Sequence, residues 1–190
     1  MTPAVFLDKD GTLLDDVPHN VDPARMRFAP GVPQGLALLA ATGWPLIVIT
    51  NQPGVALGLF EEADLARVRR RLARMFARAG ARLAGFYHCP HLPDALRPGY
   101  ALRCFCRKPE PGLLRRAACE QGLALERSWF IGDILNDVEA GRRAGCSTIL
   151  VDNGNETEWV PGPLRTPHHT VQDFAQAAHI VARCAAPEAA

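Results

Sequence analysis

The chain has 190 residues, of which 48% are hydrophobic and 22% are charged, a composition typical of a globular domain with a substantial core. This composition excludes a disordered or fibrous chain. The formal net charge of +1 gives no overall field that would hold the protein on nucleic acid or on an anionic membrane. We therefore expect a single domain over residues 1–190, a monomer without nucleic-acid or membrane partners, that recognises a small ligand locally.

The N-terminal sequence reaches an acidic cluster at Asp8 and lacks the basic and apolar stretches of a secretory signal. The longest apolar region, residues 35–49, is interrupted by Gly43 and Pro45 and is too short to cross a bilayer. We expect a cytoplasmic protein. Its six cysteines should then be reduced, so that a cluster of them indicates a metal site or buried thiols rather than disulfides.

Short β-branched runs alternate with longer helical patterns, which favours βαβ units and a parallel sheet. The expected strands are residues 4–7, 45–49, 82–88, 129–132 and 148–151. The expected helices are residues 31–42, 61–79, 111–121, a segment closed by Gly145, and 171–183. The segment between the first two strands is too short for a separate lid domain. We predict an α/β fold, a Rossmann-like three-layer sandwich with a mostly parallel central sheet and a minimal cap.

Polar residues follow the predicted strands, where ligands bind in open α/β sheets. Asp8 and Asp10 come after the first strand, and alternation of side chains should point both carboxylates into one pocket. Further polar residues at strand ends or in the loop before residue 111 are Thr50, Asn51, Gln52, Arg107, Lys108, Asp133 and Asp137. Carboxylates, a hydroxyl, an amide and two cations should therefore converge at one edge of the sheet.

This set of groups suits phosphoryl transfer. Asp8 would attack phosphorus and form an aspartyl-phosphate, and Asp10 would donate and later accept a proton. Mg²⁺ would be held by Asp8, Asp133 and a backbone carbonyl, and we include Asp10 among its candidate ligands. Thr50 and Lys108 would bind the phosphoryl oxygens.

Each of these residues also has an ordinary structural interpretation. An Asp-x-Asp-Gly segment is common in turns, and an aspartate at the start of a helix is a common cap. Lys108 could be a surface lysine. Coincidence of all these groups with strand ends favours a shared site.

The ordered segments resemble the four motifs of the haloacid dehalogenase (HAD) superfamily of phosphatases. They are Asp8-Lys9-Asp10-Gly11-Thr12, Thr50-Asn51, Lys108-Pro109, and Gly132-Asp133 with Asp137. The resemblance implies a Rossmann-like core, Mg²⁺, an aspartyl-phosphate intermediate and almost no cap.

A second cluster contains Cys89, His91, Cys104 and Cys106. Three thiolates and one imidazole form a closed set suited to structural Zn²⁺, although the one-residue gaps are tighter than usual. Free buried cysteines and a surface histidine remain the alternative. A zinc-stabilised loop over about residues 89–106 would order the segment that leads directly into Lys108.

This loop and the run from Thr50 to Gly58 resemble the D-glycero-D-manno-heptose 1,7-bisphosphate 7-phosphatases, enzymes of lipopolysaccharide core synthesis. The resemblance implies substrate recognition by Arg107 and a substrate-binding set that also includes Asn51, Gln52 and, in a partly matching loop, Asp16 and His19. Leu57 stands where these enzymes usually have arginine, and Ile134 where a polar residue is common.

The leading prediction is a Mg²⁺-dependent sugar-phosphate phosphatase. The related histidinol-phosphate phosphatases carry a similar Cys/His loop and offer the nearest alternative substrate. A receiver-like module that is phosphorylated without turnover is the alternative of a different class, although it would need neither the proton donor nor a zinc loop. A phosphatase of nucleic-acid ends is disfavoured by the near-neutral charge and the lack of aromatic residues for base stacking.

Overall fold

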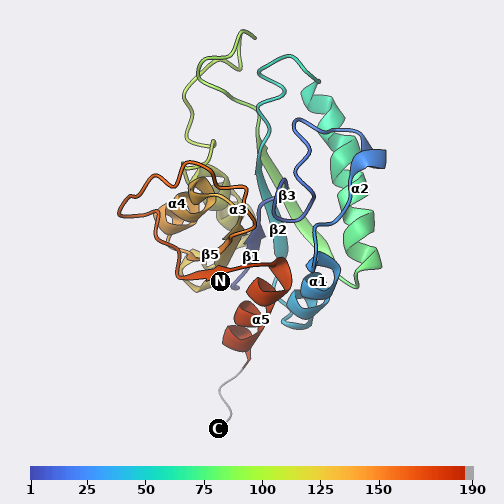
Figure 1. The fold of residues 1–190 in the computed structure, drawn as a ribbon, viewed down its shortest axis with the longest axis vertical. Coiled ribbons are helices and arrows are strands. Elements are labelled where there is room, and N and C mark those ends of the chain that lie inside the picture. The colour runs from blue at the N-terminus through green and yellow to red at the C-terminus, as the bar shows by residue number, and fades with distance from the viewer. Residues whose placement is uncertain (187–190) are drawn as a thin grey trace.

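A six-stranded parallel sheet forms the centre of the computed structural model, which describes residues 1–186 (Figure 1). The strand order is β3-β2-β1-β4-β5-β6 and every neighbouring pair is parallel. The strands are β1 Val5–Leu7, β2 Leu46–Asn51, β3 Leu83–Cys89, β4 Trp129–Gly132, β5 Ser147–Val151 and β6 His169–Val171. The connections reverse direction on either side of β1, so the carboxyl ends of β1, β2 and β4 form the crevice where such sheets bind ligands.

Helices cover both faces of the sheet and make the three layers that the sequence predicts (Figure 1). They are α1 Val32–Ala41, α2 Leu65–Arg78, α3 Gly112–Gln121, α4 Leu135–Ala144 and α5 Phe174–Ala185. One core, centred on Val5, Leu7 and Val48, packs against α1, α2 and α5, and the other, centred on Phe6 and Ile47, packs against α3 and α4. Because successive side chains point to opposite faces, strands covered on both sides are continuously apolar. In residues 1–186, no helix combines the length and apolarity needed to cross a membrane.

The C-terminal region corrects one prediction. The expected helix over residues 171–183 begins only at Phe174, because Asp173 is its N-cap and accepts a hydrogen bond from the Gln176 backbone at 2.9 Å. Val171 instead belongs to the short edge strand β6, paired with Val151. Three residues are too few to show strand periodicity in the sequence.

The predicted helix over residues 61–79 is also shorter than expected. Residues Glu62–Asp64 form a single 3-10 turn, and the α-helix follows from Leu65. The Asp64 side chain accepts a hydrogen bond from the Glu61 backbone at 3.0 Å, which stabilises the tighter first turn.

Candidate active site

The loop after β1 is a tight turn that carries Asp8 and Asp10. The Lys9 carbonyl accepts hydrogen bonds from the backbones of both Leu13 and Leu14, so the loop folds back on itself. Gly11 has φ +84°, and a Cβ added to it would lie 2.1 Å from the Asp133 carboxylate. The loop after β1 therefore approaches Asp133 more closely than any other residue type at position 11 would allow.

Three buried carboxylates, from Asp8, Asp133 and Asp137, meet at the carboxyl ends of β1 and β4. One oxygen from each lies within 4.8 Å of the others. The Lys108 ammonium contacts Asp8 Oδ1 and Asp137 Oδ1, each at 2.5 Å. Residues separated by more than a hundred positions thus form one charged cluster, as the strand-end argument predicts.

The cluster holds more negative charge than Lys108 balances. Burial raises the pKa of Asp8 well above its ordinary value against the opposing effect of Lys108, and Asp137 and Asp133 raise it further. Burial and the charge of Asp137 raise the pKa of Asp133 to about 6. Ionisation of all three carboxylates would leave two negative charges beyond the one that Lys108 balances. A hard divalent cation with oxygen ligands would supply the missing charge, which is the chemistry of Mg²⁺.

Lys108 remains protonated despite its burial. Removal from water lowers the pKa of its ammonium, but the charges of Asp137 and Asp8 outweigh this effect and raise it above the ordinary value. Its Nζ also lies 3.4 Å from the Ile49 carbonyl at the end of β2. A fixed positive charge therefore stands beside the predicted nucleophile, where phosphoryl oxygens would need it.

Asn51 positions Lys108 through its backbone. The Asn51 amide donates to the Lys108 carbonyl at 3.1 Å and accepts from the Lys108 N–H at 3.0 Å. These two hydrogen bonds fasten the end of β2 to the loop before α3. Asn51, which we predicted to bind substrate, thus has a clear structural role in placing the lysine.

Asp10, Gln52 and Thr50 form a hydrogen-bonded chain beside the carboxylates. The Asp10 carboxylate accepts from Lys9 Nζ at 2.6 Å and from Gln52 Nε2 at 2.9 Å. Gln52 Nε2 also donates to Thr50 Oγ1 at 2.9 Å. The Asp10 side chain stands outside the trio of Asp8, Asp133 and Asp137, so an acid-base role suits this carboxylate better than ligation of the metal.

The second predicted cluster is assembled in space. The sulfurs of Cys89, Cys104 and Cys106 lie 3.1–3.5 Å apart, and His91 Nδ1 lies 3.6 Å from Cys89 and 3.3 Å from Cys106. Tetrahedral Zn²⁺ with bonds of about 2.3 Å places its sulfur ligands about 3.8 Å apart. A small outward shift of the four side chains would thus admit the ion, and the donor set fits zinc.

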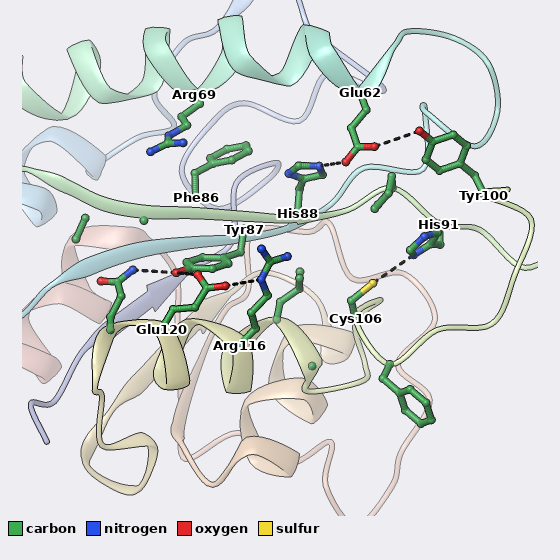
Figure 2. A pocket seen from close by; sticks show the side chains of 17 residues that line it. Glu62, Arg69, Phe86, Tyr87, His88, His91, Tyr100, Cys106, Arg116 and Glu120 are labelled. Carbon is green, nitrogen blue, oxygen red and sulfur yellow. Dashed lines mark hydrogen bonds and ion pairs between the residues drawn. The ribbon is translucent and has the colours of Figure 1, made fainter.

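The loop that carries this cluster is also held by hydrogen bonds to Glu62, outside the cluster. It borders a hollow of about 700 Å³ along β3, with His91 and Cys106 at one end (Figure 2). Glu62 joins His88 of β3, at 2.7 Å, to Tyr100 of the loop, at 3.1 Å. The segment that ends at Lys108 therefore has an anchor besides the Cys/His cluster.

The remaining residues singled out in the sequence lie outside the carboxylate cluster. Arg107 is half-buried and donates to the His91 carbonyl at 3.3 Å. Asp16 and His19 are exposed on the segment after the β1 loop. Leu57 is 43% exposed. Ile134 uses its backbone, whose N–H donates to Asp137 Oδ2 at 3.3 Å, so this contact does not need a polar side chain at position 134.

The segment after β5, which carries no predicted site residue, also contacts the site. Asn153 Nδ2 donates to the Gly11 carbonyl at 2.7 Å, and Asn155 Nδ2 donates to Asp133 Oδ2 at 2.8 Å. The Glu156 carboxylate accepts from the Leu135 backbone at the start of α4, at 2.6 Å. Their place directly after a parallel strand is the one sequence signal that could have indicated them.

The chain is similar to known phosphatases. A family model described as HAD-hydrolase-like matches residues 105–177. The chain is 39% identical over 155 residues to the D-glycero-beta-D-manno-heptose-1,7-bisphosphate 7-phosphatase of Photorhabdus laumondii. The match covers 80% of this chain and 81% of that protein.

Two solved structures share the fold over most of both chains. The D,D-heptose 1,7-bisphosphate phosphatase of B. bronchiseptica, complexed with magnesium and phosphate, has a TM-score of 0.77 and 30% identity, covering 96% of this chain and 99% of that one. A HAD-like phosphatase of Mesorhizobium loti has a TM-score of 0.84 and 29% identity, covering 99% and 90%. The chain therefore belongs to the heptose-1,7-bisphosphate 7-phosphatase family of HAD-like phosphatases, a family of phosphoric monoester hydrolases.

Proposed function

We propose that this phosphatase removes the 7-phosphate of D-glycero-β-D-manno-heptose 1,7-bisphosphate with Mg²⁺ and an aspartyl-phosphate intermediate. The observation that carries the proposal is the buried trio of Asp8, Asp133 and Asp137 against the single Lys108 ammonium. The proposed substrate is that of the heptose-1,7-bisphosphate 7-phosphatases, which match four-fifths or more of the chain.

In the first step, an oxygen of the Asp8 carboxylate forms a bond to phosphorus and the bond from phosphorus to the sugar oxygen breaks. The Lys108 ammonium favours the ionised form of Asp8 and would, with Thr50, bind the phosphoryl oxygens. When bound through Asp8, Asp133 and a backbone carbonyl, Mg²⁺ would neutralise phosphoryl charge. Asp10 would give its proton to the departing sugar oxygen.

In the second step, Asp10 takes a proton from water, whose oxygen attacks phosphorus and releases phosphate from Asp8. Gln52 holds Asp10 in place for both transfers, since its amide joins Asp10 to Thr50. One carboxyl group thus acts first as acid and then as base, and the enzyme returns to its starting protonation state.

The rest of the substrate would lie toward the Cys/His loop. A hollow of about 480 Å³ is lined by Arg103, Arg107 and Lys108 and suits a sugar with a second phosphate. Asp16 and His19, on the exposed segment after the β1 loop, are further proposed contacts of the sugar. We further propose that Zn²⁺ binds Cys89, His91, Cys104 and Cys106 as a structural ion.

The test is phosphate release from α- and β-anomers of the heptose bisphosphate, from histidinol phosphate and from other small phosphate esters, with and without Mg²⁺. We expect the highest kcat/KM for the β-anomer, release of the 7-phosphate only, and no turnover after removal of Mg²⁺. A higher kcat/KM for histidinol phosphate would show that this ester, and not the sugar, is the substrate. One phosphorylation per chain without turnover would favour the receiver-like alternative.

A further inference from the structure

The loop after β5 reaches across the carboxyl edge of the sheet to the carboxylate site. Three of its side chains contact three different parts of that site: Asn153 binds the Gly11 carbonyl, Asn155 binds Asp133, and Glu156 binds the first residue of α4. These partners lie 142, 22 and 21 positions away in the chain. The loop therefore links the segments that follow β1 and β4.

Asn155 is the member of this loop that touches a predicted metal ligand. Its Nδ2 lies 2.8 Å from Asp133 Oδ2 and 3.4 Å from the Gly11 carbonyl oxygen. Both neighbours are oxygens that accept hydrogen bonds from it, so the nitrogen of the amide, and not its oxygen, must face them. Asn155 thus acts as a hydrogen-bond donor to the carboxylate.

The Asp133 carboxylate is held at both oxygens. Thr12 donates to Oδ1 at 2.6 Å from the loop after β1, while Asn155 donates to Oδ2 from the loop after β5. Each carboxylate oxygen has two acceptor positions, so each keeps one for a cation. The two donors fix the carboxylate's rotation without using up its capacity to bind metal.

Asn155 is itself held in place by its neighbours. Asn153 Oδ1 accepts from the Asn155 N–H at 3.3 Å, and Glu156 Oε1 accepts from the Glu158 N–H at 2.9 Å. Glu156 reaches the start of α4 with its other oxygen. The Asn155 amide therefore lies on a turn that is already held by hydrogen bonds, so it would not need to become ordered when the metal binds.

We infer that Asn155 is a positioning residue for Asp133 and sets the affinity of the site for Mg²⁺ through this hydrogen bond. The inference rests on the proposed function, because that function makes Asp133 a metal ligand. Loss of a partner that orients a metal ligand typically weakens metal binding about 10- to 100-fold.

The experiment is calorimetric titration of Mg²⁺ into the full chain and its variants. We expect Asn155→Ala to weaken Mg²⁺ binding about 10- to 100-fold. The Mg²⁺ concentration for half-maximal activity should rise in parallel, while KM for substrate at saturating Mg²⁺ stays unchanged. Thr157→Ala is the matched control, because Thr157 is exposed in the same loop. Melting temperatures in a metal chelator check that all variants fold.

Asn155→Leu separates hydrogen bonding from packing, since leucine has a similar shape without the amide. It should bind Mg²⁺ as weakly as Asn155→Ala, and recovery of wild-type affinity would overturn the inference, as would unchanged affinity in Asn155→Ala. Wild-type protein that binds no Mg²⁺ would overturn both the inference and the proposed metal site. Weaker Mg²⁺ binding in both variants of a protein without phosphatase activity would support the inference and reject the proposed function.

Discussion

The two clusters of candidate metal ligands share one edge of the sheet but differ in burial, charge and donor atoms. The Asp8, Asp133 and Asp137 cluster offers hard oxygens, is buried, and carries charge that Lys108 only partly balances. The other cluster offers three sulfurs and one imidazole, which is the number of donors that a complete tetrahedral Zn²⁺ site needs. A metal ion in the oxygen site could exchange a water ligand for substrate. A metal ion with four protein ligands has no open position and would only stabilise the loop.

The two clusters are nevertheless joined by a very short piece of chain. Cys106 belongs to one and Lys108, two residues later, contacts the other. Asn51 fastens the same Lys108 backbone to β2. We therefore propose that the sulfur cluster contributes to catalysis by placing the Lys108 cation, and the following experiments separate the roles of the two clusters.

Replacement of the nucleophile should have the largest effect. Asp8→Asn should lower kcat on the order of 10⁴-fold or more, because an amide cannot form the acyl phosphate. The measurement is phosphate release, with Asp94→Asn, an exposed aspartate outside the site, as control. Activity within tenfold of wild type would reject Asp8 as nucleophile.

Replacement of the proposed acid-base group should have a smaller effect that depends on the substrate. Asp10→Asn should lower kcat about 10²- to 10⁴-fold for a sugar phosphate, whose alkoxide leaving group needs a proton. The loss should be much smaller for an aryl phosphate whose phenolate leaves without one. Rates for both esters are compared in the same variant, and equal losses would contradict the acid role of Asp10.

Disruption of the sulfur cluster should reduce zinc content first and activity second. Cys104→Ser should abolish tightly bound zinc, expected at about one ion per chain in the wild type, and lower the melting temperature. Without the zinc-bound loop, Lys108 should be displaced in the Cys104→Ser variant, and kcat should fall by up to about 10²-fold. Elemental analysis and phosphate release measure the two effects, with Cys119→Ser, an exposed thiol on α3, as control. Wild-type protein without zinc would leave the cluster as ordinary thiols.

The carboxylate cluster should make metal-free protein less stable as pH rises. The pKa of Asp133 is raised from 3.8 to about 6, so between these values the native state holds a proton that the unfolded state has released. The free energy of unfolding should therefore fall from about pH 4 to pH 6, by about 2–3 kcal/mol for this one group. Denaturant unfolding in a chelator measures it.

Two additions sharpen this measurement. Saturating Mg²⁺ should reduce the loss, because the cation replaces the proton as partner of the carboxylates. Asp133→Asn should remove the contribution of that group from the pH dependence. A difference between wild type and Asp133→Asn that stays constant from pH 4 to pH 6 in the chelator would show that burial and Asp137 do not raise the pKa of Asp133.

Much of this arrangement was predictable from short stretches of sequence. Buried parallel strands are continuously apolar, so the runs at residues 4–7 and 45–49 identified β1 and β2 to within a residue or two at either end. Because parallel strands end at one edge, the polar residues after them indicated a common site with Asp8, Lys108 and Asp133. The resemblance to HAD phosphatases, carried by the same residues, is confirmed by the comparisons.

Other features depend on contacts that no local pattern encodes. The hydrogen bonds from Asn155 to Asp133 and from Asn51 to the Lys108 backbone join segments far apart in the chain, and asparagines in loops look alike whether or not they make such contacts. The edge strand β6 exists through its pairing with β5 rather than through its own propensity. The sequence by itself determined which residues can carry charge and which predicted strand each of them follows. Only the tertiary structure decided which charges share a partner, because burial and distance arise when the loops pack together.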